Sequence, residues 1–395
     1  MSRYRLTPTP TPAQEVILLE HCAHARYVWN LAVEQHSWYP RRRRPAPGYL
    51  AQVRQLTEAR AENQWLARGS QMVQQEALRD FDQALRNFFH STHRKPTFRK
   101  KDRNEGFRIV AVKPGDVRRV SRNTGEVKIP KVGWVRFRWS RAVAKAKSFR
   151  VTLDRAGRWH VASAAIPEPI PGPGTGEVVG VDRGVTVSAA LSTGELLTVA
   201  RLSPARQACR KRLQRQLARG QRGSNRRRRT KLAVARLTAR EADARKDWAE
   251  KLSTDLARRF DVIRVEDLKI TSMTRSARGT VAEPGTNVGA NAGLNREILA
   301  SGWGLLVRRL EQKAPGRVEK INPAYTSQRC SACGHIAADS RKSQALFACV
   351  ACSFACNADV NAAINIAAGR AVNARGGDRA TGPVKREPHE LLLAS

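Results

Sequence analysis

Residues 327–363 read SQRCSACGHIAADSRKSQALFACVACSFACNADVNAA and contain five of the seven cysteines in a chain of 395 residues. Cys330 and Cys333 form one Cys-x-x-Cys pair, and Cys349 and Cys352 form a second pair after a spacer of fifteen residues. This spacing is typical of a zinc ribbon, in which each pair forms a tight turn that directs two thiolates at one ion. Four thiolates complete a tetrahedral shell and leave no position for a substrate. The sequence therefore predicts a structural Zn²⁺ site.

The spacer between the two pairs is long enough for a β-hairpin that joins the two turns. The remaining cysteines have ordinary explanations. Cys356 and His335 exceed the four ligands that zinc needs, and we interpret Cys356 as a small buried residue rather than a fifth ligand. Cys22 and Cys209 lie far away on helical patterns, where cysteine packs as a small apolar group.

An acidic residue ends a predicted buried strand upstream. Residues 178–181 read VVGV, and Asp182 follows them. A second strand is predicted at 185–191, and Gly194 marks the turn after it. Because burying a lone charge is costly, Asp182 needs a partner. A metal ion and an ion pair with Arg183 are the two candidates.

Two further acids occupy comparable places. The segment DVIRVED, residues 261–267, predicts a short strand that ends at Glu266 and Asp267. Residues 357–372 predict a final helix with Asp359 in its first turn, where a carboxylate also serves as a simple cap. Taken singly, each acid has an ordinary structural explanation.

The order of the three acids is more specific than any one of them. An Asp on a first strand, a Glu at the end of a later strand and an Asp on a final helix is the arrangement of RNase H-like nucleases. We therefore predict that Asp182, Glu266 and Asp359 are catalytic and bind two divalent cations. Such ions activate water and stabilise the leaving oxygen of a phosphodiester. Oxygen ligands favour Mg²⁺ or Mn²⁺.

The charge of the chain indicates a polyanionic partner. Lys and Arg number 72 and Asp and Glu 34, a formal net charge of +38. Such an excess destabilises a compact chain unless a polyanion neutralises it, and nucleic acid is the best candidate. A membrane surface is the alternative, but the sequence has no lipidation motif, no apolar run of about 20 residues and no signal peptide. We expect a cytoplasmic bacterial protein, in which clustered thiols bind metal rather than form disulfides.

With these residues identified, the sequence resembles the TnpB (OrfB) proteins of bacterial insertion sequences, which are relatives of the type V CRISPR effector nucleases. The resemblance spans about residues 1–370. It rests on GVDRG around Asp182, VEDL around Glu266, PAYTSQRCSACGH at 323–335 and FACVACSFACNADVNAAINIA at 347–367.

The resemblance implies an RNA-guided DNA endonuclease of α+β multidomain architecture, with guide RNA and double-stranded target DNA as partners and no obligate protein partner. Its RNase H-like domain is of the RuvC type. The expected parts are an N-terminal β-barrel with an inserted helical recognition lobe (1–172), the first part of the RuvC-like domain (173–325) with a basic helical insertion (203–258) and a flexible lid (271–295), the zinc ribbon (326–356), the final RuvC helix (357–372) and a disordered tail (373–395).

The sequence departs from the family pattern at two positions. Ser353 stands where Gly is usual, so the turn there should be strained. Arg183 stands where an apolar residue is commoner. Neither change removes a carboxylate, which argues against a binding-only RNA-guided protein. A miniature type V CRISPR effector and a DNA transposase proper are two further candidate functions.

Basic residues on two predicted elements are candidate nucleic-acid contacts, although both could be plain solvated faces. Helices are predicted at 12–35 and 50–90 in the N-terminal part, and the strand WVRFRW at 134–139 follows them. Apolar and basic residues alternate along this strand, so its apolar side chains should point inward and its arginines outward. The candidates are Arg136 and Arg138 on this strand, and Arg226, Arg227, Arg228 and Arg229 in the basic insertion.

Overall fold

The computed structural model describes residues 2–6, 8–39, 46–103, 105–139, 147–165 and 168–369. The chain forms two compact units. Unit 1 comprises Met1–Ile170, Val199–Thr254 and Arg308–Pro315, and unit 2 comprises Pro171–Thr198, Asp255–Val307 and Gly316–Ser395. The tail predicted at 373–395 lies outside the described residues.

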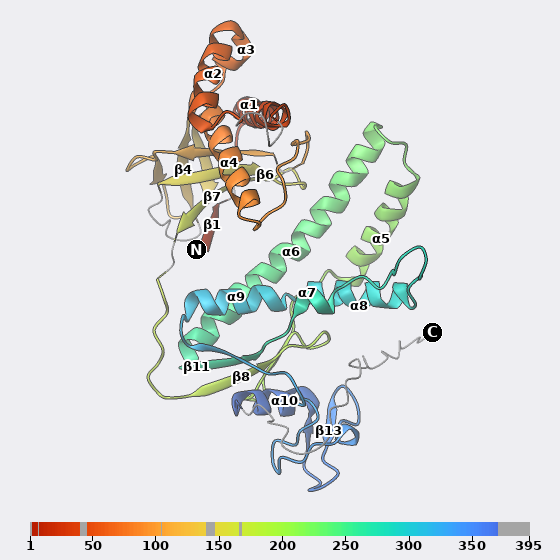
Figure 1. The fold of residues 1–395 in the computed structure, drawn as a ribbon. Helices are drawn as coiled ribbons and strands as arrows, with labels where there is room; N and C mark the ends of the chain where they lie inside the picture. Colours follow the sequence, from red (N-terminus) through yellow and green to blue (C-terminus); the bar gives the residue numbers. More distant parts are fainter. Residues whose placement is uncertain are drawn as a thin grey trace. The chain divides into compact units, whose positions relative to one another are not determined.

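Unit 1, drawn in red to yellow in Figure 1, contains two antiparallel sheets. Their strand orders are β1-β7-β6-β2 and β3-β4-β5. Their strands are β1 (Ser2–Leu6), β2 (Gly106–Val110), β3 (Val117–Arg119), β4 (Thr124–Ile129), β5 (Gly133–Arg138), β6 (Ser148–Leu153) and β7 (Trp159–Ala165). In β5, Val135 and Phe137 are buried whereas Arg136 and Arg138 are exposed. The alternation predicted for this strand is confirmed.

The N-terminal helices of unit 1 are α1 (Pro12–Ser37), α2 (Tyr49–Glu62), α3 (Gln64–Arg68) and α4 (Gln71–Phe89). The prediction of one helix at 50–90 is therefore wrong. The chain breaks at Asn63, whose side chain accepts the N–H groups of Trp65 and Leu66 and so caps α3. It breaks again at Gly69, where an added Cβ would lie 2.5 Å from Gln74.

One core joins these helices to both sheets. Leu18 of α1, Phe81 of α4, Phe107 of β2 and Phe137 of β5 belong to the same buried cluster. Each is at most 2 % exposed. Burial of such side chains is the main stabilising contribution to a unit of this kind.

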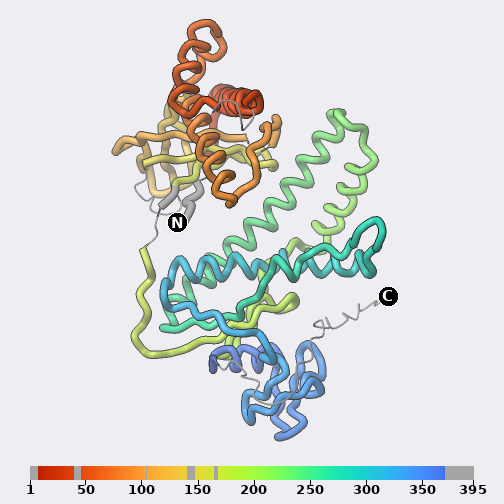
Figure 2. Tube along the Cα trace, viewed as in Figure 1, coloured from red at the N-terminus to blue at the C-terminus, as the bar shows by residue number. Residues whose placement is uncertain are grey.

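The basic insertion forms a helical hairpin of α5 (Pro204–Arg219) and α6 (Asn225–Arg259), which run side by side in Figure 2. An ion pair between Arg210 and Glu241 (2.5 Å) joins them. At the turn, Arg227 donates to the carbonyl oxygens of Leu217 and Gly220. Helix α5 has no buried residue. Its arginines and lysines are therefore exposed or half-buried.

Unit 2 is built on a five-stranded sheet of order β10-β9-β8-β11-β12. Strands β8, β11 and β12 are parallel, and β9 and β10 continue from β8 as antiparallel neighbours. The strands are β8 (Val178–Asp182), β9 (Ala189–Leu191), β10 (Leu196–Leu197), β11 (Val262–Glu266) and β12 (Val318–Ile321). The strand predicted at 185–191 is thus limited to its last three residues.

Within the described residues, the α-helices that follow β11 are α7 (Ile270–Met273), α8 (Val288–Ser301), α9 (Trp303–Lys313) and α10 (Ala358–Ala367). The predicted lid at 271–295 contains parts of α7 and α8 and an isolated bridge between Gly279 and Pro284. Its mobility stays a prediction. Within the described ranges, no helix has both the length and the hydropathy that crossing a bilayer requires.

Candidate functional site

The four cysteines of the two Cys-x-x-Cys pairs converge on one point of unit 2. Their Sγ atoms lie within 4.8 Å of one another, with 3.7 Å between Cys330 and Cys352 and 3.6 Å between Cys333 and Cys349. Thiolates around one zinc ion would be about 3.8 Å apart, given a tetrahedron with Zn–S bonds of about 2.3 Å. The donor set therefore fits a tetrahedral Zn²⁺ ion.

Each pair is closed by the residue that follows it. The N–H of Gly334 donates to the carbonyl of Cys330 (2.9 Å), and the N–H of Ser353 donates to the carbonyl of Cys349 (3.1 Å). Both closing residues have a left-handed backbone, with φ of 79° at Gly334 and 56° at Ser353. Because Cβ is crowded in this conformation, the prediction of a strained turn at Ser353 is confirmed.

The rest of the ribbon consists of the short helix η1 (Ala338–Ser340) and the hairpin of β13 (Leu346–Ala348) and β14 (Ala355–Asn357). This hairpin encloses the second pair, so the prediction that a hairpin joins the two pairs is wrong. Cys356 lies half-buried on β14, and exposed His335 offers only its backbone carbonyl, to Cys330. Neither side chain belongs to the group of four.

Two of the predicted catalytic acids lie at the ends of neighbouring strands. Val181 pairs with Val265 in the parallel ladder of β8 and β11. Asp182 and Glu266 are the next residues along these strands. Since the carboxyl ends of parallel strands meet at one edge of a sheet, these two acids lie beside each other.

The third acid arrives on α10, which packs against β8. The contact passes through Gly180, where an added Cβ would lie 2.0 Å from the carbonyl oxygen of Ala363 and 2.4 Å from the nitrogen of Ala367. Only a residue without a side chain permits this approach. Asp359, in the first turn of α10, is thereby brought within electrostatic reach of Asp182.

Burial and neighbouring charge oppose the ionisation of these acids. Burial, with the nearby charges of Glu266 and Asp359, raises the pKa of Asp182 to about 7. Burial also raises the pKa of Glu266 and that of Asp359. Among the described residues, only the four cysteines form a group of at least three His, Cys, Asp or Glu side chains whose ligand atoms all lie within 4.8 Å. The carboxylates are therefore spread more widely than the ligands of one small ion.

Two ordinary explanations were open for these acids: a cap of α10 for Asp359, and an ion pair with Arg183 for Asp182. In the structure, another residue caps α10, and the Arg183 guanidinium donates to a backbone carbonyl. The cap of α10 is Asn357, whose Oδ1 accepts the N–H groups of Asp359 (3.0 Å) and Val360 (3.2 Å). The guanidinium of Arg183, 5 % exposed, donates to the backbone carbonyl of Glu266. The carboxylate of Asp359 is thus not needed as the cap of α10.

Two contacts of the acids were not predicted from the sequence. Arg341, from the spacer of the ribbon, lies 3.2 Å from Oδ1 of Asp359. Thr326 donates its hydroxyl to Oε1 of Glu266 at 2.7 Å. The only sequence signal for Thr326 was its position just before the first Cys-x-x-Cys pair.

The predicted nucleic-acid contacts differ in their surroundings. Arg226, Arg228 and Arg229 are exposed on α6, whereas half-buried Arg227 closes the turn between α5 and α6. On β5, Arg136 is exposed and lies 3.4 Å from Glu126.

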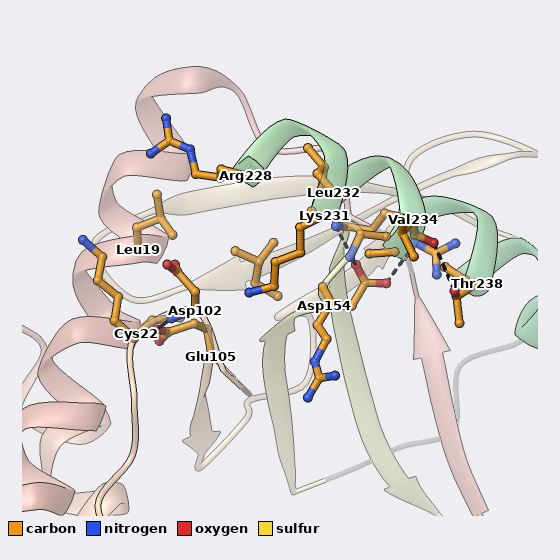
Figure 3. Close-up of a pocket in the computed structure, with 18 of the residues that line it drawn as sticks. Leu19, Cys22, Asp102, Glu105, Asp154, Arg228, Lys231, Leu232, Val234 and Thr238 are labelled. Carbon is orange, nitrogen blue, oxygen red and sulfur yellow. Dashed lines mark hydrogen bonds and ion pairs between the residues drawn. The ribbon is translucent and has the colours of Figure 1, made fainter. Parts of the chain in front are cut away.

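Unit 1 has a separate cavity of about 1160 Å³, lined by α1, the turn between β6 and β7, and α6 (Figure 3). An ion pair between Arg158 and Asp243 (2.5 Å) spans it. Its lining carries both signs of charge and contains none of the three predicted catalytic acids, all of which belong to unit 2.

Three protein families match parts of the chain. The family described as "Probable transposase" matches residues 161–277, and "Cas12f1-like, TNB domain" matches residues 303–366. A family described as "Helix-turn-helix domain" matches residues 2–44, whose described part forms β1 and α1.

Individual relatives match along nearly the whole chain. The protein named "Putative RNA-guided DNA endonuclease InsQ" of Escherichia coli (strain K12) is 34 % identical over 403 residues, which cover 100 % of this chain and 99 % of the relative. A similarly named protein of Streptomyces pristinaespiralis is 30 % identical, covering 95 % and 90 %. The solved structure titled "Cryo-EM structure of the Cas12f1-sgRNA-target DNA complex" has a TM-score of 0.51 at 14 % identity and covers 90 % of this chain and 83 % of its own. That likeness concerns the fold.

Proposed function

Since this chain belongs to the TnpB (OrfB) family, we propose that it is an RNA-guided DNA endonuclease whose cutting site consists of Asp182, Glu266 and Asp359. The relatives that match along nearly their full length carry this activity in their names. One observation supports the site above all others. Asp182 and Glu266 end neighbouring parallel strands, and the helix that carries Asp359 packs on the first of these strands.

The proposal extends to the architecture. A five-stranded sheet in which only β9 runs opposite to the other strands, with an acid on its first strand and another on the helix α10 packed against it, supports an RNase H-like domain of the RuvC type. The two sheets and four helices of unit 1 would then be the β-barrel and its recognition lobe. The four-cysteine group would be a structural zinc ribbon between β12 and α10.

The three carboxylates fit a pair of divalent cations. Their spread beyond 4.8 Å suits two ions, which lie about 3.5–4 Å apart in such sites. Oxygen ligands favour Mg²⁺ or Mn²⁺, and bound ions of this kind supply an activated water and stabilise the leaving oxygen. Asp182 and Glu266 are oriented by the sheet and Asp359 by α10. The raised pKa of Asp182 supports a bound cation, because these side chains need a positive charge between them to ionise fully.

Guide RNA and target DNA are the partners that we propose for the positive surface. Arg226, Arg228 and Arg229 are free of the turn contacts that occupy Arg227. Arg136 and Arg138 point out of the sheet on β5. Side chains of this kind bind phosphates irrespective of sequence.

The test is guide-dependent cutting and binding of target DNA by the same preparations. Asp182→Ala, Glu266→Ala and Asp359→Ala should each reduce cutting by orders of magnitude and leave target binding intact, because the carboxylates hold ions and repel phosphates. Asp267→Ala is the matched control, since Asp267 is exposed beside buried Glu266. Normal cutting by Asp359→Ala, or equal losses in the variants of Asp267 and Glu266, would contradict the proposed site.

A further inference from the structure

Glu266 is held at two points. The hydroxyl of Thr326 donates to its carboxylate at 2.7 Å, and Arg183 donates to its backbone carbonyl. Thr326 is 6 % and Glu266 9 % exposed. The Thr326 hydroxyl is also 3.1 Å from the carbonyl of Pro323. Since a charged acceptor makes the stronger hydrogen bond, the shorter contact to Glu266 takes the proton.

Thr326 is itself tied to the helix that carries Asp359. The side-chain amide of Asn365 on α10 donates to the carbonyl oxygens of Thr326 (3.0 Å) and Arg329 (2.8 Å). Asn365 is 7 % exposed. Because a buried carbonyl without a donor is destabilising, these bonds define where the segment before the first cysteine pair lies.

A second asparagine extends the same attachment to the cysteines. Asn361 donates to the carbonyl of Arg329 (2.8 Å) and accepts the N–H of Ser331 (3.0 Å), and it is fully buried. Residues four apart lie on one face of a helix, so Asn361 and Asn365 together form hydrogen bonds with the segment 326–331. Arg329 and Ser331 flank Cys330. The first Cys-x-x-Cys turn, α10 and Glu266 are thus connected by hydrogen bonds between buried and half-buried groups.

We propose that Thr326 is a positioning residue for the Glu266 carboxylate, and that Asn365 sets the place of Thr326 from α10. This inference rests on the proposed cutting site. A carboxylate among like charges turns away from them unless a donor fixes its orientation, and Thr326 supplies that donor. Asn365 and Asp359 both lie on α10. The spacing between the Glu266 and Asp359 carboxylates therefore depends on where this one helix lies.

The test compares Thr326→Val, which keeps the shape and removes the hydroxyl, with Thr326→Ser, which keeps the hydroxyl. The measurements on the protein–guide RNA complex are zinc content, target-DNA binding, cutting rate, and Mn²⁺ affinity by calorimetry. Thr326→Val should retain zinc and target binding but lose about 10- to 100-fold in cutting rate and Mn²⁺ affinity, as is typical when a group that orients a metal ligand is removed. Thr326→Ser should keep the cutting rate and the Mn²⁺ affinity of the unmodified protein.

A double substitution tests the connection through α10. If Asn365 acts through Thr326, Asn365→Ala should reduce cutting in the unmodified protein and add little in the Thr326→Val background. Additive losses would overturn the role of Asn365.

Other outcomes reject the role of Thr326. Unchanged cutting and Mn²⁺ affinity in Thr326→Val would overturn it, as would loss of zinc or of the folded protein, which would make Thr326 a structural residue only. Glu266→Ala separates this inference from the proposed function: normal cutting by that variant would refute the site itself, whereas an inactive Glu266→Ala beside an active Thr326→Val would refute only the positioning role.

Discussion

At the scale of single residues, the turns of the two Cys-x-x-Cys pairs are a matched pair that differs in the residue closing each turn. Gly334 and Ser353 make the same hydrogen bond and both have a left-handed backbone. Glycine adopts this conformation without crowding, whereas a residue with Cβ is destabilised in it by about 1–2 kcal/mol. The second turn is therefore the more strained of the two.

Ser353→Gly should stabilise the ribbon by up to about 1 kcal/mol, because the relief of strain exceeds the extra freedom that glycine gives the unfolded chain. The measurement is the chelator concentration that removes half of the zinc, together with the midpoint of thermal unfolding. Gly334→Ser is the control and should shift both in the opposite direction. A lower midpoint for Ser353→Gly would show that the Ser353 side chain contributes a contact.

Two buried histidines of α1 make unit 1 sensitive to acid. Nε2 of His21 lies 2.8 Å from the carbonyl of Pro130, and Nε2 of His24 lies 3.0 Å from that of Trp65. The Nδ1 atoms of both rings are buried without a hydrogen-bond partner. Burial lowers the pKa of His21 and that of His24, although these carbonyls oppose the shift.

Acidification should therefore destabilise unit 1. The folded-state pKa of each ring lies below the unfolded value of about 6.5, so the unfolded chain binds more protons as the pH falls through that value. Stability is complete above pH about 6.5 and declines below it. Thermal unfolding from pH 7.5 to 5.5 should show this decline, and His21→Gln with His24→Gln should flatten it. An equal decline in the double variant would assign the effect to other groups.

At the scale of elements, the packing of α10 on β8 determines where the third acid lies. Gly180→Ala should place a methyl group against the backbone of α10 and push the helix away, which moves Asp359 from Asp182. Overpacking of this kind destabilises by about 1–3 kcal/mol. We expect a lower unfolding midpoint and a large loss of cutting.

The control for this substitution is Gly289→Ala in α8. An added Cβ there meets nothing within 4 Å, and alanine favours a helix. The unfolding midpoint and the cutting rate of this variant should be unchanged or slightly raised. Full cutting by Gly180→Ala would mean that α10 need not lie so close to the sheet.

At the scale of the whole molecule, the formal net charge of +38 favours binding to polyanions. Its affinity for guide RNA should fall steeply with salt, since each neutralised phosphate releases counterions. Arg228→Gln with Arg229→Gln should lower the affinity and reduce the slope of log affinity against log salt by up to about 2.

Arg227→Gln is the matched control for these arginines. Arg227 closes the turn between α5 and α6, so its loss should lower thermal stability and change the slope little. An unchanged salt slope in the Arg228 and Arg229 variant would exclude these side chains as phosphate contacts.

The sequence alone predicted the residues to which we assign the chemistry. Its correct predictions depend on short spacings, which backbone geometry translates directly into position. They are the two cysteine pairs, the acid that ends each strand and the alternation along β5. The prediction of one helix at 50–90 was wrong because its breaks depend on local capping by Asn63 and on the packing of Gly69 against His24 and Gln74. Apolar periodicity continues through such breaks and does not reveal them.

Only the tertiary structure determined how these residues meet. Gly180 admits α10, Thr326 reaches Glu266 across 60 positions, and Arg341 approaches Asp359 from the spacer of the ribbon. Local composition does not specify such pairs, since each depends on how closely two distant segments pack and on which buried carbonyl or carboxylate lacks a donor. The sequence therefore predicted the three acids of the proposed site, and tertiary packing determined their spacing, the electrostatics around Asp182 and the groups that contact Glu266 and Asp359.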